Sequence, residues 1–164
     1  MSLDVHIRWM VRRDMPEVMA IEREAFEFPW SESDFLQWLR SVRCIGLVAE
    51  HKKRVVGFVV YELHEQKIHL ANIAVAKHIH RMGVGSKLCR KLIGTLTNRR
   101  RSRIFTTVRE SNVAAQMFFA ANGFRATGTI ARLYDETDED AYTFTYDINR
   151  VDVDINELCD RLFS

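Results

Sequence analysis

The stretch that decides the fold reads NIAVAKHIHRMGVGSKL and covers residues 72–88. It begins with an apolar run that is typical of a β-strand and ends in the first turn of an amphipathic helix. Two glycines, Gly83 and Gly85, stand where that helix begins. The first amide groups of a helix have no intrahelical partners and carry partial positive charge, so they suit an anion. Glycines let that anion approach the backbone.

The spacing of the glycines limits what the anion can be. A dinucleotide fingerprint needs a third glycine where Leu88 stands, and a P-loop needs Gly-Lys-Ser/Thr after four spacer residues, whereas here the order is Gly85-Ser86-Lys87. The alternative is that the two glycines only relieve a tight turn between strand and helix. The pattern by itself therefore favours a phosphorylated ligand without naming it.

Outward from this stretch the chain alternates between strand and helix patterns. Ser31 with Asp34 and Asp14 with Glu17 have the spacing of capping boxes at two helix starts. Period-two alternation along the strand at 69–75 predicts that His69 and Ile73 share a face. The order predicts an α/β domain with a mixed sheet. Strands are expected over 5–11, 44–50, 55–61, 69–75, 104–108, 125–130 and 141–148, and helices over 14–26, 31–42, 83–96 and 112–122.

Length and composition set the class of protein. The 164 residues, 47% of them hydrophobic, predict one domain over 1–150 and an amphipathic tail helix over 151–164 that either docks on its own core or makes a dimer contact. The formal charge of +2 gives no reason to expect nucleic acid, and no apolar run is long enough to span a membrane. Three cysteines without a metal-ligand spacing fit a reducing cytoplasm. Monomer and homodimer are both open.

Four stretches together resemble the Gcn5-related N-acetyltransferase (GNAT) superfamily, and within it the RimI-type protein N-terminal acetyltransferases. They are IEREAFEFPWSESDF at 21–35, NIAVAKHIHRMGVGSKL at 72–88, VRESNVAAQMFFAANGF at 108–124 and RLYDETDEDA at 132–141. The stretches occur in the order that the family has. The resemblance implies the GNAT fold, with a mixed, mostly antiparallel central sheet flanked by helices.

The resemblance also implies a ligand for the glycine loop, namely the pyrophosphate of acetyl-CoA. Backbone groups of Ile73, Ala74 and Val75 would pair with the pantetheine arm, and Asn112 would bind the cofactor as well as cap a helix. His80 stands where the family usually has Gln or Arg, which makes pyrophosphate affinity more dependent on pH. No metal is implied. The loop residues expected to hold the pyrophosphate are Arg81, Met82, Gly83, Val84, Gly85 and Ser86.

The acceptor implied by the resemblance is the α-amine of a protein or peptide N-terminus. The aromatic segment Phe28, Pro29 and Trp30 would line the peptide cleft together with Tyr134, although Phe28 and Trp30 suit a core or helix-staple role equally well. An α-amine with a pKa near 8 is about one tenth neutral at pH 7, against ~0.04% for lysine, so it demands less of a catalytic base.

Two positions depart from the RimI pattern. Thr107 stands where these enzymes have a glutamate base, and Phe119 where they have a tyrosine acid. Neither side chain can perform that proton chemistry. We therefore predict that His69, helped by Tyr134 or an ordered water, replaces the base.

Several alternatives stay open on the sequence. The two lost groups also fit a weak or inactive CoA-binding regulatory module, and a lysine or small-amine acceptor fits the same family. A metal site on His64, His69, His78 and His80 is disfavoured because no cysteines or paired carboxylates accompany them in the sequence. The helix at 112–122 is expected to bury Ala114, Met117 and Phe119 in the core.

Overall fold

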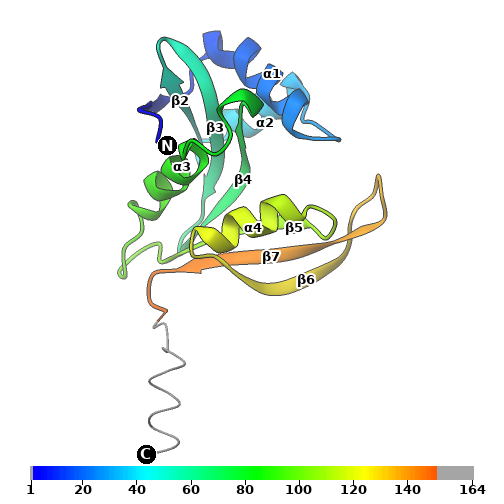
Figure 1. Cartoon of the computed structure of the whole chain (residues 1–164). Helices are drawn as coiled ribbons and strands as arrows, with labels where there is room; N and C mark the ends of the chain where they lie inside the picture. The colour runs from blue at the N-terminus through cyan, green and yellow to red at the C-terminus, as the bar shows by residue number, and fades with distance from the viewer. Residues whose placement is uncertain (1, 151–164) are drawn as a thin grey trace, which may run out of the picture.

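The computed structural model describes residues 2–150, which form four α-helices, two 3-10 turns and seven strands (Figure 1). Residues 151–164, for which the sequence predicts a tail helix, lie outside the described residues. The helices are α1 (Met15–Ala25), α2 (Glu32–Arg40), α3 (Val84–Ile93) and α4 (Val113–Ala121), and the turns are η1 (Arg12–Asp14) and η2 (Lys77–Ile79). The strands are β1 (His6–Trp9), β2 (Cys44–His51), β3 (Arg54–Leu63), β4 (Lys67–Val75), β5 (Arg103–Arg109), β6 (Arg125–Tyr134) and β7 (Glu139–Asp147).

All seven strands join one sheet in the order β1-β2-β3-β4-β5-β7-β6. Every neighbouring pair is antiparallel except β4 and β5, which are parallel. One apolar cluster packs α3 and α4 against one face, and a second packs α1 and α2 against the other. This is the predicted mixed, mostly antiparallel sheet flanked by helices.

The helices within residues 2–150 are short. The longest, α1, has 11 residues, and none of the described helices is both long and apolar enough to cross a bilayer, which takes about 20 residues.

One of the two expected capping boxes is confirmed and the other is wrong. The Ser31 hydroxyl accepts from the Asp34 amide while the Asp34 carboxylate accepts from the Ser31 amide, as predicted for the start of α2. Asp14 instead directs its carboxylate to both terminal nitrogens of Arg8, at 2.8 Å each, and to the Val11 amide. A 3-10 turn precedes α1, so Asp14 closes that turn and ties β1 to α1.

The helix α4 is less buried than its composition predicts. Phe119 is buried, but Met117 is 67% exposed and Ala114 is exposed as well. The expectation that all three pack in the core is wrong because α4 covers the sheet with one face only, and its opposite face lies at the surface.

A β-bulge in β4 overturns the prediction that His69 and Ile73 share a face. Asn72 pairs with Val60 but Leu70 pairs with Tyr61, so Ala71 is one extra residue in β4. Ile73 consequently packs with the α3 side of the core, whereas His69 meets Trp38 of α2. A bulge adds one residue to the strand, so side chains beyond it lie on the opposite face from the one that simple alternation predicts. The apolar pattern of the sequence does not reveal this change.

The contact between Arg8 and Asp14 yields a test of stability. Asp14 is 3% exposed, and the hydrogen bonds from Arg8 lower its pKa. We expect Asp14→Asn to cost about 2–3 kcal/mol of unfolding free energy at pH 7, because it removes the more buried of the two carboxylates that pair with Arg8, the other being Glu50. The stabilisation is fully present above the ordinary carboxyl pKa and is lost as the pH falls through the lowered one. Urea denaturation should therefore show a constant difference from wild type between pH 8 and 5 that shrinks below about pH 4. A difference that persists unchanged in acid would contradict this account.

Candidate active site

The strands β4 and β5 separate in the middle of the sheet. They pair only through Lys67 with Arg103, Ile68 with Ile104, and His69 with Phe105. Beyond this point both strands continue, to Val75 and Arg109, without pairing with each other in the described chain. Figure 1 shows β7 and β6, which follow β5, running in a clearly different direction from β2–β4. An extended ligand can therefore pair with backbone groups along this edge of β4.

The two glycines at the start of α3 are needed for different reasons. Gly83 has a φ of +80°, and a Cβ built there has no closer neighbour than the Ser2 hydroxyl at 3.9 Å. Gly85 instead faces Phe118 of α4, whose ring would stand 3.0 Å from an added Cβ. Gly83 thus serves the turn and leaves open space at the helix start, whereas Gly85 allows α3 and α4 to pack closely.

Two contacts fix the glycine loop to the rest of the protein. The His80 ring donates from Nε2 to the Val75 carbonyl at 2.9 Å, and the Leu3 amide donates to the Met82 carbonyl at 2.9 Å. The ring of His80 is thus held against the end of β4. This contact makes His80 an anchor of the loop.

Asn112 caps α4, as predicted. Its side-chain oxygen accepts from the Ala115 amide at 3.1 Å. The cap uses Oδ1, and the side-chain amide group is the part that can serve a ligand. Asn112 follows β5 by three residues, so α4 begins beside the opening between β4 and β5.

The aromatic segment between α1 and α2 divides into a half-buried and an exposed part. Trp30 stacks on Trp38 at 5.5 Å and meets Phe35 edge-on, so it serves as a staple for α2. Phe28 is 38% exposed and Pro29 is exposed. Of the three residues predicted to line the cleft, Phe28 and Pro29 are thus exposed and Trp30 is half-buried.

A buried carboxylate holds this segment in place. Glu22 is 1% exposed and accepts from the Trp30 amide at 2.9 Å and from the Asn72 side chain at 2.9 Å. Burial raises its pKa, against the effect of the two hydrogen bonds. Glu22 thereby couples the segment to β4 next to Ile73.

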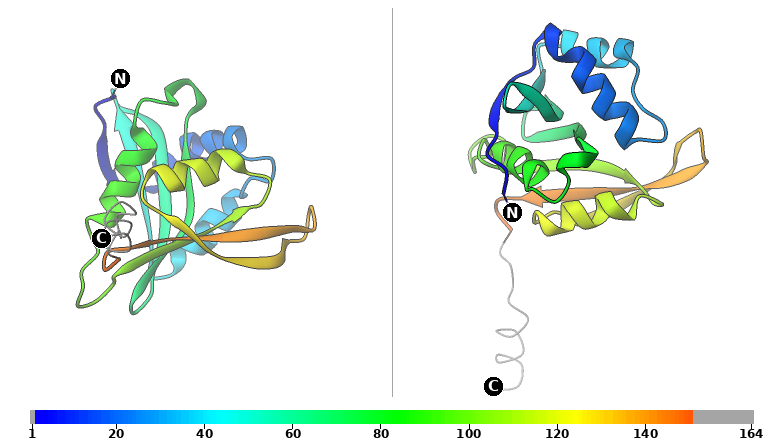
Figure 2. Two further views of the ribbon diagram at one scale, coloured as in Figure 1. Left: turned by 60° about the horizontal axis from the view of Figure 1, so that its bottom comes forward. Right: turned by 45° about the horizontal axis from the view of Figure 1, so that its top comes forward.

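Tyr134 lies at the tip of the β6–β7 hairpin over Arg109. The Arg109 Cζ is 3.9 Å from the centroid of the Tyr134 ring and 4.8 Å from that of Phe28. The tip of the hairpin and the segment after α1 lie on the same side of the molecule in both Figure 1 and the right view of Figure 2. The predicted walls of the acceptor cleft thus face each other across Arg109.

His69 belongs to a cluster at the end of the β3–β4 hairpin. Its ring stacks on Phe105 at 4.7 Å, and its Nδ1 is 4.0 Å from the Glu62 carboxylate, which also contacts His64 Nε2 at 3.3 Å. Burial lowers the pKa of His69, and the charge of Glu62 opposes that effect while His64 and Lys67 add to it. The imidazole is therefore neutral at neutral pH and able to accept a proton.

Glu62, His64 and His69 are also the kinds of side chain that bind metals, and their donor atoms lie within 4.8 Å of one another. Of the four histidines weighed in the sequence, the structure brings only these two together. The Glu62 carboxylate contacts His64 at 3.3 Å and lies 4.0 Å from His69, and attraction between the carboxylate and the imidazoles is sufficient to hold the three side chains together.

The two residues that depart from the RimI pattern lie in different places: Phe119 in the core and Thr107 on a half-buried face of β5. Phe119 is buried among Phe118, Phe124 and Phe144, so its slot is part of the core. Thr107 is half-buried and shares a face of β5 with Phe105 and Arg109. On this face it lies between His69, which stacks on Phe105, and Tyr134, which stacks on Arg109.

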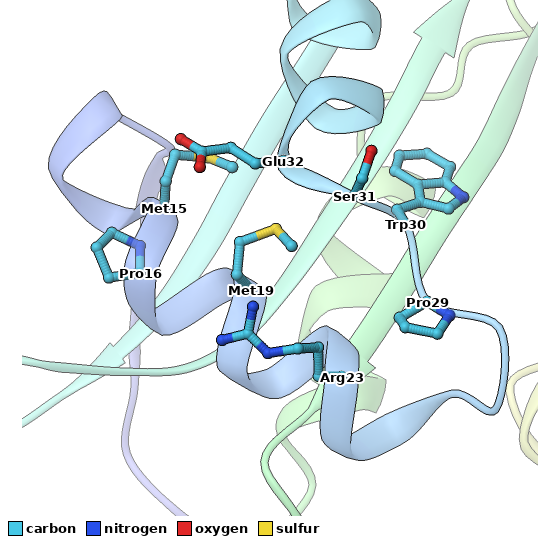
Figure 3. A pocket seen from close by; sticks show the side chains of 8 residues that line it. All are labelled: Met15, Pro16, Met19, Arg23, Pro29, Trp30, Ser31 and Glu32. Carbon is cyan, nitrogen blue, oxygen red and sulfur yellow. The ribbon is translucent and has the colours of Figure 1, made fainter.

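A surface cavity of about 620 Å³ lies between α1 and the start of α2 (Figure 3). Of its lining residues only Arg23 and Glu32 are charged, the others being Met15, Pro16, Met19, Pro29, Trp30 and Ser31. Neither the glycine loop nor the free edge of β4 contributes to it. This cavity is therefore separate from the opening between β4 and β5.

A protein-family model matches most of the chain. The acetyltransferase (GNAT) family model matches residues 15–124. The chain belongs to the GNAT family. It is an acyltransferase, and an uncharacterized N-acetyltransferase of Methanocaldococcus jannaschii is 31% identical over 81% of this chain and 86% of its own length.

Solved structures of GNAT proteins share the fold. The ribosomal-protein-S18-alanine N-acetyltransferase of Escherichia coli superposes with a TM-score of 0.79 and 27% identity over 92% of this chain and 98% of its own. Arabidopsis thaliana Naa50, solved with the bisubstrate analogue CoA-Ac-MVNAL, has a TM-score of 0.73 at 16% identity over 88% of this chain and 99% of its own. The relatives include ribosomal-protein-S18-alanine N-acetyltransferases, which confirms the RimI-type resemblance seen in the sequence.

Some residues of the site have weak signals in the sequence. Glu22 stands on an amphipathic helix where a charged residue normally faces solvent, and Glu62 and Arg109 sit at strand ends, where charge is common. A glutamate on the apolar stripe of α1 is the one sign that could have singled out Glu22. The aromatic and carboxylate partners of Arg109 come from distant segments, whereas Glu62 meets His64 and His69 within the β3–β4 hairpin.

Gly83→Asn tests whether an anion approaches the start of α3. Asn tolerates positive φ, and the space around Gly83 is open, so the variant should fold with little change in Tm. Its side chain would occupy the space that a pyrophosphate needs, and we expect acetyl-CoA affinity to fall about tenfold or more in calorimetry. Valine is a poorer choice at this φ, because a branched side chain adds backbone strain.

The matched control is Gly128→Asn, where an added Cβ meets nothing within 4 Å. It should bind acetyl-CoA like wild type. Unchanged affinity in a folded Gly83→Asn protein would show that no ligand approaches this turn.

Proposed function

We propose that this protein transfers the acetyl group of acetyl-CoA to the α-amine of a protein or peptide N-terminus. The observation that carries the proposal is the opening between β4 and β5. It has the glycine turn of α3 at one end, and the walls formed by Phe28 and Tyr134 on the acceptor side. The relatives named for S18-alanine acetylation and for a CoA-peptide analogue support this acceptor class.

Acetyl-CoA would lie along β4 and end at α3. The pantetheine arm would pair with backbone groups of Ile73, Ala74 and Val75, and one amide there would polarise the thioester carbonyl. Asn112, at the start of α4, would bind the arm from the other side. The pyrophosphate would lie on the turn formed by Arg81, Met82, Gly83, Val84, Gly85 and Ser86.

The reaction joins two substrates directly. The neutral amine nitrogen attacks the thioester carbon, and the carbonyl electrons move to oxygen in a tetrahedral intermediate. The intermediate collapses by breaking the C–S bond, which releases CoA as a thiolate that takes up a proton. The amine loses one proton in the process, so this chain must provide a route for that proton.

His69 is our candidate for the base that receives this proton. It faces the same side of the sheet as Trp30 and Asn72, which is the acceptor side, and its lowered pKa keeps it neutral. Tyr134 is separated from it by the stretch of β5 from Phe105 to Arg109, about 13 Å at ~3.3 Å per residue. The two side chains thus flank Thr107 from opposite ends, and a water relay would connect His69 to the amine.

A pair of peptides tests the acceptor. Peptides of identical sequence, each with an internal lysine, would be offered with a free or a blocked N-terminus, and the products located by mass spectrometry. We expect acetylation at the free α-amine and loss of transfer in the blocked peptide, because lysine is ~0.04% neutral at pH 7. Lysine acetylation of the blocked peptide at a comparable rate would assign the enzyme to a different acceptor class.

His69→Gln tests the base, with His64→Gln as its control in the same cluster. We expect His69→Gln to lower kcat more than tenfold at pH 7, since general bases contribute about 10²-fold or more, and the deficit to shrink toward pH 9 as the amine deprotonates by itself. Because burial lowers the pKa of His69, the wild-type rate should decline only below pH 6.5 from loss of this base. A His69→Gln enzyme with wild-type kcat from pH 6 to 9 would leave the amine to deprotonate without help.

A further inference from the structure

Arg109, the last residue of β5, contacts both walls of the acceptor cleft at once. Its guanidinium carbon lies 4.8 Å from the Phe28 ring centroid and 3.9 Å from that of Tyr134. The same group contacts the hairpin tip through Thr137 at 3.0 Å, Glu136 at 3.3 Å and Glu139 at 3.4 Å. One side chain from the central sheet therefore joins two segments that are about a hundred residues apart in sequence.

The hairpin tip follows a strand, β6, that is exposed along most of its length. All residues of β6 from Arg125 to Leu133 are exposed, and the register with β7 shifts between Ile130 and Tyr134. The Arg109 side chain is 20% exposed, so its base is held by the sheet while its charged end reaches the tip. The tip is also held by the pairing of Tyr134 with Glu139 and by the Glu110 and Arg132 amides, which donate to Asp140, but none of these contacts reaches Phe28.

The opposite wall is anchored independently. The segment after α1 is fixed through Glu22, which binds the Trp30 amide, but Phe28 lies two residues before that anchor and is exposed. Arg109 is thus the contact that sets Phe28 relative to Tyr134.

We propose that Arg109 is a positioning residue that sets the width of the acceptor cleft by bracing Phe28 against the β6–β7 tip. The inference rests on the proposed function and deepens it, because it names the group that fits the cleft to the first residues of a peptide. An arginine suits the role, since its planar guanidinium stacks on aromatic rings while its N–H groups bind carboxylates. A lysine ammonium is a point charge that cannot do both.

The test compares Arg109→Met with Arg132→Met. Arg132 lies in the same hairpin, pairs at 3.7 Å with Asp138, and is 77% exposed, so its substitution removes the same charge without touching the brace. The backbone amide of Arg132, which donates to Asp140, is kept. Arg109→Lys retains the charge and tests the planar group by itself.

Hydrogen exchange tests whether Arg109 holds the two segments together, and peptide kinetics test whether this contact matters for acceptor binding. Amide hydrogen exchange should become faster at both 26–31 and 134–139 in Arg109→Met, and stay at wild-type rates in Arg132→Met. With a free N-terminal peptide, KM should rise about tenfold or more while kcat stays within about twofold, because uniform binding is lost. The Kd for acetyl-CoA should be unchanged, and Arg109→Lys should fall between wild type and Arg109→Met.

The outcomes are distinct. Wild-type exchange in Arg109→Met, or equal changes in Arg132→Met, overturns the brace. Faster exchange at both segments with an unchanged KM overturns the link to the acceptor. A wild-type enzyme that acetylates no free N-terminus refutes the proposed function, and the exchange measurement still decides whether Arg109 braces the two walls.

Discussion

The separation of β4 from β5 is the constraint on which the rest of the site depends. A backbone edge in the middle of a sheet normally finds a partner, because unpaired buried N–H and C=O groups are costly. Here pairing stops after His69 and Phe105, and the antiparallel pairing of β5 with β7 continues. The sheet therefore consists of two halves that pair only at one end, and beyond that end this edge of β4 has no neighbouring strand in the described chain.

The bulge at Ala71 acts on the same region. It lets Ile73 point into the α3 side of the core while Asn72 reaches Glu22 on the α1 side. The acceptor segment is thereby tied to the strand that would hold the thioester. The proposed cofactor side and the proposed acceptor side would thus be coupled through one buried carboxylate with two hydrogen-bond donors, and loss of either donor would leave Glu22 incompletely satisfied.

The departures from the RimI pattern have a common physical meaning. Phe119 completes an aromatic cluster with Phe124 and Phe144, so a hydroxyl there would need a partner inside the core. Thr107 leaves an uncharged surface between His69 and Tyr134. In the proposed reaction the proton would be transferred from the ends of that surface, and burial, which lowers the pKa of His69, favours the neutral form that a base requires.

The sequence by itself determined the family, the order and type of the elements, the glycine turn and the caps at Ser31 and Asn112, because these depend on local spacing and on backbone preferences of single residues. It also left the role of Phe28 and Trp30 undecided and placed His69 on the wrong face. Only the tertiary structure showed that Trp30 stacks on Trp38 while Phe28 lies against Arg109, and on which face His69 lies, together with the contacts of Asp14, Glu22 and Glu62. The physical reason is that a bulge changes the face on which a side chain lies without a sequence signal, and a charged side chain takes its role from partners that only the fold brings to it, as Asn72 at Glu22 and Phe28 at Arg109.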